Sequence, residues 1–346
     1  MATKETKMSI WALDPQVELE QIPVLLSIDY SRNIEYLDDY ELSELDKKLL
    51  NRWIEYDQAH GFNIQQQDVL GNVVRFIIAK AYFETAAPPE SAIIEGYGPL
   101  PRDRRIAANE MPVLFFESHE RVYVIVTGSD YKTRFIRTVL MGGGRLSDEN
   151  HRRWGKVQSK EINNYSFSSE FFYWLISKQN STVTVDGISL EISDIRFLSQ
   201  TGTERSDVRH ESKGANITDE AISKTGLGVN SRVGQVGTTI GFTGGNFRLI
   251  LFEDGSCWID NNLSSINGTT GELEPFEANL EIGSLSLYAS ILPLFKASFN
   301  ADRDQGRWTI ELQASSRKLW ALGAINELCS ENEITIDEIQ NLEWFT

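Results

Sequence analysis

The stretch that decides the fold is 233–260, VGQVGTTIGFTGGNFRLILFEDGSCWID. Glycine, threonine and apolar residues alternate at its start, and two groups of turn-forming residues, Gly244-Gly245-Asn246 and Glu253-Asp254-Gly255, divide it into three β-prone runs. Such groups between β-prone runs are typical of antiparallel hairpins, because glycine and asparagine adopt the backbone conformations that tight turns need. We therefore predict a three-stranded antiparallel meander in this stretch.

Helices are expected on the C-terminal side of the meander. Leu280 to Leu292 and Ser315 to Cys329 have mostly helical patterns. Pro293 is expected to end the first of these helices, because proline lacks the backbone N–H that a helix interior requires. The meander is thus expected to be flanked by helices.

A short helix and a hairpin are expected on the N-terminal side of the meander. Thr182 to Val185 and Ile188 to Leu198 are β-prone and are joined by Asp186-Gly187, a pair that favours a tight turn. Ser169 to Lys178 concentrates five large apolar residues in one short helical run, which must be largely buried.

The first half of the chain is expected to begin with helices. Asp39 to Tyr56 repeats leucine and aromatic residues at three- and four-residue steps, which predicts an amphipathic helix. Gln66 to Phe83 predicts a second helix that is apolar on most sides. Pro112 to Glu117 and Arg121 to Thr127 predict a hairpin, and Tyr131 to Met141 predicts a helix closed by three glycines.

The predicted fold class is α+β, with mixed helices, antiparallel hairpins and the C-terminal three-stranded meander flanked by helices. Two segments punctuated by proline, glycine or polar residues, Ala87 to Pro101 and Thr201 to Asn216, are candidate boundaries. They divide the chain into a mainly helical region 1–100, an α+β region 101–210 that contains a basic segment, and a region 211–346 with the meander and the C-terminal helices.

Composition limits the class of protein. The chain has 346 residues, of which 41% are hydrophobic, and a formal net charge of −17, which favours solubility and opposes non-specific attraction to nucleic acid or an anionic membrane. The two cysteines, Cys257 and Cys329, exclude a disulfide framework. No run of about 18 uncharged apolar residues indicates a membrane span. We expect a cytoplasmic protein that does not bind a membrane.

One segment opposes the overall charge. Residues 131–160 contain eight basic and two acidic residues, a formal charge of +6, so the other 316 residues carry −23. Two arginines share the outward face of the expected helix, and the glycines that follow lead to a cluster of arginines beside a tryptophan, which suits phosphate or carboxylate recognition. The candidate partner- or anion-binding residues are Arg134, Arg137, Arg145, Arg152, Arg153, Trp154 and Lys156. A second interpretation is that these cations balance the chain's own 50 carboxylates, within the monomer or across a subunit contact.

The C-terminal segment, Glu331 to Thr346, has the opposite chemistry. It contains five acidic residues and no lysine or arginine, beside several large apolar residues. As a docking element its anchors are Ile339, Leu342, Trp344 and Phe345. The alternative is an ordinary C-terminal helix that closes the core.

Motifs of known chemistries are missing from the sequence. It contains no GxxxxGK[ST] loop, HExxH or GxSxG, and its four histidines are scattered. Two loose groups of polar residues approximate a metal site: Asp186, Glu191 and Asp194, and Asp304, Glu311, Gln313 and Lys318. Because 50 acidic residues produce such spacings by chance, we assign no catalytic residue, metal or cofactor.

These observations predict a non-enzymatic, oligomeric, intracellular protein that binds other macromolecules as a protein-interaction or regulatory protein. Self-association and a protein partner are expected, and an intracellular chain without housekeeping motifs is compatible with a role in phage–host conflict. The alternative is a nucleic-acid-binding protein or metal-dependent nuclease that uses the basic segment 131–160.

Overall fold

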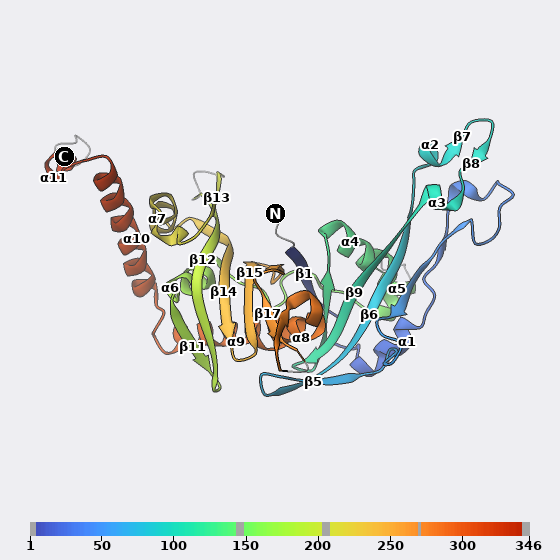
Figure 1. Ribbon diagram of the computed structural model, residues 1–346, viewed down its shortest axis with the longest axis horizontal. Helices are drawn as coiled ribbons and strands as arrows, with labels where there is room; N and C mark the ends of the chain where they lie inside the picture. Colours follow the sequence, from blue (N-terminus) through green and yellow to red (C-terminus); the bar gives the residue numbers. More distant parts are fainter. Residues whose placement is uncertain (1–4, 143–148, 203–207, 269–270, 341–346) are drawn as a thin grey trace. The chain divides into compact units, whose positions relative to one another are not determined.

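The computed structural model describes residues 5–142, 149–202, 208–268 and 271–340. Its helices and antiparallel strands form two compact units (Figure 1). The N-terminal unit consists of Thr6–Ile162 and Leu280–Ala289, and the C-terminal unit consists of Met1–Glu5, Asn163–Asn279 and Ser290–Thr346. Helices and antiparallel strands together make this an α+β protein, as the sequence predicts.

The central strands of the C-terminal unit are β12 (Ile188–Thr201), β14 (Arg232–Phe242), β15 (Gly245–Phe252) and β16 (Cys257–Asp260), which pair in this order. Each strand is antiparallel to the next. The three strands expected in 233–260 are therefore present as β14, β15 and β16. Phe242 pairs with Gly245, so two residues make the first turn of the meander.

Short strands extend this sheet. β11 (Ser181–Val185) forms a hairpin with β12, and the two turn residues, Asp186 and Gly187, have φ angles of 51° and 81°. Both angles lie in the left-handed region that an Asp-Gly turn adopts, so the local sequence determines this hairpin. β13 (Arg209–Lys213) pairs with β12, while β17 (Ser265–Asn267) pairs with β15 and with β18 (Leu273–Pro275).

One face of this sheet is buried. Alternate residues of β15 and β16, among them Phe247, Leu249 and Ile259, are excluded from solvent. Helix α6 (Ser169–Ser177) contacts β14, and every residue from Phe171 to Ile176 is buried, as its apolar sequence predicts. Its first turn is capped by the Ser168 hydroxyl, which accepts a hydrogen bond from the Phe171 N–H at 3.2 Å. Further helices of the unit, in the part of the chain that the structure describes, include the 3₁₀ turn η4 (Ile217–Asp219), α7 (Ala221–Gly228), α9 (Leu292–Asp304), α10 (Ile310–Glu331) and α11 (Ile336–Gln340).

The N-terminal unit has its own run of antiparallel strands. They pair in the order β1 (Glu5–Ala12), β10 (Arg121–Thr127), β9 (Ile106–Ser118), β6 (Asn72–Ala86) and β4 (Asn51–Glu55), and β5 (Gln65–Val69) pairs with β6. The hairpin predicted from 112–127 is present as β9 and β10. Its turn is made by His119 and Glu120, whose φ angles of 50° and 58° allow a two-residue connection.

The helix predicted from Gln66 to Phe83 is wrong, because these residues form the β5–β6 hairpin. Leu70 and Gly71 make its turn, with φ angles of 53° and 83°. Consecutive residues of β6 such as Phe76, Ile77 and Ile78 are all buried, so both faces of the strand are covered. A continuous apolar run of this kind does not distinguish a fully buried strand from a buried helix.

The amphipathic helix predicted from Asp39 to Tyr56 is also wrong. The segment contains β3 (Lys48–Leu49), which pairs with β2 (Arg32–Asn33), followed by β4. Asn51 and Trp53 are buried while Arg52 between them is exposed, which is the period of a strand. Region 1–100 is therefore mostly strand and irregular structure rather than mainly helical.

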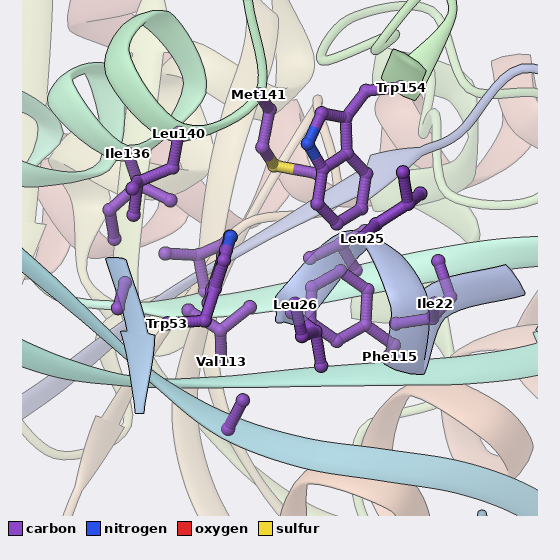
Figure 2. Close-up of a cluster of buried hydrophobic side chains, with 14 of the residues drawn as sticks. Ile22, Leu25, Leu26, Trp53, Val113, Phe115, Ile136, Leu140, Met141 and Trp154 are labelled. Atoms are coloured by element: carbon purple, nitrogen blue, oxygen red, sulfur yellow. The ribbon is translucent and has the colours of Figure 1, made fainter. Parts of the chain in front are cut away.

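Helices of the N-terminal unit bury one face of its sheet. These are α1 (Ile22–Leu26), which follows the 3₁₀ turn η1 (Leu19–Gln21), and then α4 (Asp130–Phe135), the π-helical turn η3 (Ile136–Leu140) and α5 (Glu149–Trp154). Figure 2 shows side chains of α1, η3 and α5, together with Met141, directed at Trp53, Val113 and Phe115 of the sheet. The helix predicted from Tyr131 to Met141 is present as α4 and η3.

The end of the β6–β9 pair carries a smaller cluster. The 3₁₀ turn η2 (Glu35–Leu37) contributes to it, and the short elements α2 (Pro89–Ala92), β7 (Ile93–Ile94), β8 (Gly98–Pro99) and α3 (Arg102–Arg105) connect β6 to β9. Ile34, Leu37 and Leu49 are its buried apolar residues. Arg102 Nη1 donates hydrogen bonds to the carbonyls of Leu45 and Lys48 at 2.6 and 2.8 Å. These charge-assisted hydrogen bonds hold residues 45–48 in place where few apolar contacts are made.

Pro293 does not end a helix. The chain is helical from Phe276 to Asp304, through the 3₁₀ turn η5 (Phe276–Asn279), α8 (Leu280–Leu285), the π-helical turn η6 (Ser286–Ile291) and α9. Pro293 lies in the first turn of α9, directly after the wide π turn, where its missing N–H is tolerated. By length and composition this helix could span a membrane, but 67% of its most apolar window is buried in the protein, as in a core helix of a soluble protein.

The boundaries expected near residues 100 and 210 do not separate the two units. β6 pairs with β9 across the first boundary, and β12 pairs with β14 across the second. The units instead divide after Glu5, after Ile162 and at the two ends of Leu280–Ala289.

A buried carboxylate fixes the corner after α9. Asp302 is 5% exposed. Its carboxylate accepts hydrogen bonds from Trp174 Nε1 at 2.9 Å and from Arg307 Nε at 2.7 Å. It also forms an ion pair with Lys178 Nζ at 2.8 Å. Burial alone would raise the pKa of Asp302, but the hydrogen bonds from Lys178, Trp174 and Arg307 outweigh it and lower this pKa to about 2.

We expect Asp302→Asn to lower the free energy of unfolding of the C-terminal unit by about 3 kcal/mol at neutral pH, because the substitution leaves Lys178 without its carboxylate. The pKa of Asp302 lies below its ordinary value of 3.8, so wild-type stability from this group is complete above about pH 4 and is lost as the pH falls towards 2. Urea unfolding at pH 7 and pH 3, followed by tryptophan fluorescence, measures both effects. Equal stability of the two proteins at pH 7 would show that the ionised carboxylate is not needed.

Candidate interaction surfaces

The basic segment forms two short helices and the chain that follows them. Arg134 on α4 and Arg152 on α5 are exposed, as is Lys156 beyond α5. Arg137 is half-buried and donates a hydrogen bond to Ser159 Oγ, while Arg153 pairs with Glu149 one turn earlier on α5. Arg145 lies outside the described residues. The structure therefore leaves Arg134, Arg152 and Lys156 as solvent-facing cations that make no ion pair within the described part of the chain.

Trp154 is not on this surface. Its side chain is fully buried (0% exposed) and lies among Met141, Leu25 and Phe115 in the core of the N-terminal unit (Figure 2). The indole stacks with Phe115 at a ring-centroid distance of 5.8 Å, and its Nε1 donates to the Tyr30 hydroxyl at 3.0 Å. The expectation of an exposed indole among cations is thus corrected, because apolar area of this size is more stable in the core than beside charged side chains.

The hydrogen bond of Trp154 continues into a short chain. The Tyr30 hydroxyl donates in turn to the Leu25 carbonyl of α1 at 2.8 Å. Burial raises the pKa of Tyr30 to about 12, so the phenol stays protonated and remains a donor at every physiological pH. Trp154 therefore fastens α5 to α1 and brings Arg152 and Arg153 to the surface beside it.

Arg153 lines a shallow polar pocket of about 380 Å³ in the N-terminal unit. The other charged residues of its lining are Asp29, Arg32 and Glu149, so two cations face two carboxylates there. This balance makes the pocket a poor site for a free anion. The N-cap of α4 is Ser129, and Asp130 occupies the first helical turn, where its carboxylate repels an anion.

Helix α10 carries six exposed large apolar residues within the C-terminal unit: Ile310, Leu312, Leu319, Leu322, Ile325 and Leu328. One side of α10 packs on α7, where Ala324 is buried and Glu327 pairs with Lys224 at 2.9 Å. A β-carbon at Gly228 of α7 would approach the β-carbon of Ala321 to 2.8 Å, so the glycine permits this close packing. The sequence predicts this helix at Ser315 to Cys329, and the structure extends it to 22 residues.

The opposite side of α10 is open to solvent within the described residues. At 100° per residue, Leu319 and Leu322 lie about 140° and 160° around the helix from the buried Ala324. Leu319 is 70% exposed, Leu322 is 51% exposed and Leu312 is 45% exposed. These leucines belong to a row of residues at alternating steps of three and four, which we call the α10 seam: Leu312, Ser315, Leu319, Leu322, Asn326 and Cys329.

The α10 seam was missed in the sequence although its spacing is visible there. Apolar residues spaced three and four positions apart predict a buried stripe. In this helix Ile325 and Leu328 add apolar residues on other sides, so the spacing of the seam does not stand out in the sequence. Which stripe is covered depends on α7, which lies about 90 residues earlier in the chain.

The C-terminal segment continues this exposed region. Ile334 and Ile336 are exposed, and the docking residue Ile339 on α11 is half-buried. The other three proposed anchors, Leu342, Trp344 and Phe345, lie outside the described residues.

The open face of the C-terminal sheet contains a pocket of about 230 Å³ that sequence reasoning also missed. Arg196, Lys213 and Arg248 line it together with Trp258 and Phe197. Two of its cations are offset by carboxylates: Arg196 pairs with Asp194, and Arg248 Nε lies 4.0 Å from Asp260 Oδ2. The pocket is thus amphipathic rather than strongly cationic.

One of the two loose polar groups is partly assembled. Asp304, Glu311 and Gln313 line a pocket of about 510 Å³ at the α9–α10 corner, without Lys318. Asp186 and Glu191, by contrast, are exposed on the β11–β12 hairpin, and Asp194 pairs with Arg196. Among the described residues no group of three or more histidine, cysteine, aspartate or glutamate side chains has the arrangement of a metal site.

No protein-family model matches the chain, and a search of curated proteins finds no match. Function is therefore inferred from the α10 seam and from the exposed cations of the basic segment.

We expect Trp154→Ala to lower the free energy of unfolding of the N-terminal unit by about 3–5 kcal/mol, because it removes a buried indole and leaves a cavity. Arg152→Ala is the matched control on the same helix, and its exposed side chain predicts a change within about 0.5 kcal/mol. Chemical denaturation of both variants measures the difference. A Trp154→Ala variant as stable as wild type would place the indole outside the core.

Proposed function

We propose that this chain is a non-enzymatic cytoplasmic protein that self-associates and binds other proteins. The observation that supports the proposal is the α10 seam, in which three leucines are 45 to 70% exposed although they are aligned on one side of a long helix. Aligned apolar residues on a rigid helix are the usual form of a helix-mediated protein contact.

The free-energy argument follows from area. Complete burial of an exposed leucine contributes about 1.5–3 kcal/mol, so covering the seam supplies several kcal/mol towards association. Soluble monomers rarely leave such rows uncovered, since an uncovered row favours aggregation. A helix already anchored on α7 loses little conformational entropy when it binds, which leaves more of that free energy for affinity.

The acidic C-terminal segment and the basic segment supply further contacts in this proposal. The segment from Glu331 onward adds carboxylates and isoleucines next to α10, and Arg134, Arg152 and Lys156 offer cations on the N-terminal unit. Such surfaces suit acidic or mixed protein partners. A regulatory role, with phage–host conflict as its proposed setting, is consistent with binding in place of chemistry.

Nucleic-acid binding, or nucleic-acid cleavage by the same segment, is the second candidate function. The observation in its favour is that Arg134, Arg152 and Lys156 face solvent without a carboxylate partner in the described part of the chain. Because Trp154 is buried, its indole is not exposed for stacking on a base. Nucleic-acid binding by this segment would therefore depend on contacts between its cations and phosphate groups.

We expect Leu319→Glu/Leu322→Glu to raise the dissociation constant for self-association by at least about 100-fold, because two apolar contacts of about 1.5 kcal/mol or more are replaced by charges. The matched control is Val73→Glu/Leu273→Glu, which adds the same charge at comparably exposed apolar positions on other elements. Size-exclusion chromatography with light scattering over a range of concentrations measures the effect. A wild-type protein that remains monomeric at high concentration overturns the self-association part of the proposal.

If the second candidate holds, binding of a DNA or RNA duplex weakens steeply with added salt, and Arg134→Glu/Arg152→Glu flattens the slope of log K against log salt by about 2. Arg104→Glu/Lys318→Glu reverses two exposed cations elsewhere and is expected to leave the slope unchanged. Fluorescence anisotropy with a labelled duplex gives both slopes. Absence of binding at low salt excludes this function.

A further inference from the structure

The α10 seam has the repeat of a coiled-coil contact. Its six residues follow one another at steps of three, four, three, four and three, which places Leu312, Leu319 and Asn326 at one heptad position and Ser315, Leu322 and Cys329 at the other. The heptad row runs along the side of α10 that faces away from α7. A straight helix with a matching row is therefore the partner whose shape fits it.

The order of apolar and polar residues along the α10 seam is the same in both directions. Its order is apolar, polar, apolar, apolar, polar and apolar, if Cys329 is counted as the small hydrophobe that a thiol resembles. The centre of this order falls between Leu319 and Leu322, and it coincides with the midpoint of Ile310–Glu331. A palindromic surface centred on its own helix is what a two-fold contact between identical chains requires.

We infer that α10 pairs with α10 of a second copy of this chain in antiparallel orientation, about a two-fold axis at the middle of the α10 seam. In this register Leu319 of each copy faces Leu322 of the other, and Leu312 faces Cys329. Ser315 faces Asn326 of the second copy on both sides of the axis, so the two polar positions satisfy each other. This inference rests on the proposed self-association and specifies its surface and geometry.

The charges of the chain favour antiparallel over parallel pairing. Lys318 is the last cation of the chain, and Glu331, Glu333, Asp337 and Glu338 follow the seam. A parallel pair would place these carboxylates of both copies side by side. An antiparallel pair separates them by roughly 33 Å, the length of a 22-residue helix, which is several Debye lengths at physiological salt. It also opposes the two helix dipoles favourably.

Cross-linking tests the orientation, because Cys329 marks one end of the seam and is partly accessible. In the antiparallel pair the two Cys329 side chains are roughly 25 Å apart, whereas position 312 of one copy faces Cys329 of the other. We expect a short bismaleimide to link Leu312→Cys into covalent dimers through positions 312 and 329, identified by mass spectrometry of the linked peptides. Wild type is expected to give no covalent dimer, and Ala314→Cys, which is exposed but off the seam, very little.

The outcomes separate the inference from the proposed function. Efficient linking of wild type through Cys329 to Cys329 indicates a parallel pair and overturns the inference while self-association stands. If light scattering detects dimers but no cysteine of the α10 seam becomes cross-linked, the dimers form through another surface, and the inference is overturned as well. Light scattering of wild type and of Leu312→Cys accompanies the cross-linking. A variant that is monomeric while wild type is dimeric places position 312 in the contact, and a monomeric wild type overturns self-association itself.

Discussion

The buried carboxylate of Asp302 is the interaction on which the geometry of the C-terminal unit depends. Its side chain joins α9 to Trp174 of α6 and to Lys178, the C-cap residue of that helix. Its backbone carbonyl accepts hydrogen bonds from the Arg307 and Trp308 N–H groups at 2.7 and 2.9 Å. A buried charge is tolerated only when such donors are all in place, so the end of α9 and the turn into α10 are fixed together. From this corner α10 runs along α7 and leaves the α10 seam facing solvent.

The N-terminal unit shows how a core residue shapes a charged surface. Trp154 lies in a segment rich in arginine, yet its indole fills the space between α5, α1 and the sheet. The anchored indole holds the segment that displays the cations. Arg153 is already paired with the Glu149 carboxylate, and Arg137 is half-buried and donates to the Ser159 hydroxyl, which leaves its charge in place. Charge density in the sequence therefore overstates the charge that a partner would meet.

Hairpins were predictable where a local turn determines them. Asp186-Gly187 and the 233–260 stretch contain the residues that left-handed or glycine-specific backbone conformations require, and both hairpins are present. In the segments 39–56 and 66–83 the spacing of apolar residues predicts helices, but no Asp-Gly pair marks a turn there. In Gln66 to Phe83 the apolar run reflects burial of both faces of β6 by elements that are distant in the chain, and this burial overrides the apparent helical pattern.

The sequence by itself determined the α+β class, the turn-defined hairpins, the apolar helix α6 and the concentration of charge in 131–160 and at the C-terminus. It also contained the three-four spacing of the α10 seam, but the same spacing describes a stripe that is buried in a core and one that is exposed. Only the tertiary structure decided between them, because α7 covers the side of α10 that carries Ala324 and no described element covers Leu319 and Leu322. In the same way only packing decided that Trp154 is a core residue, since burial is a property of neighbours that the local sequence does not contain.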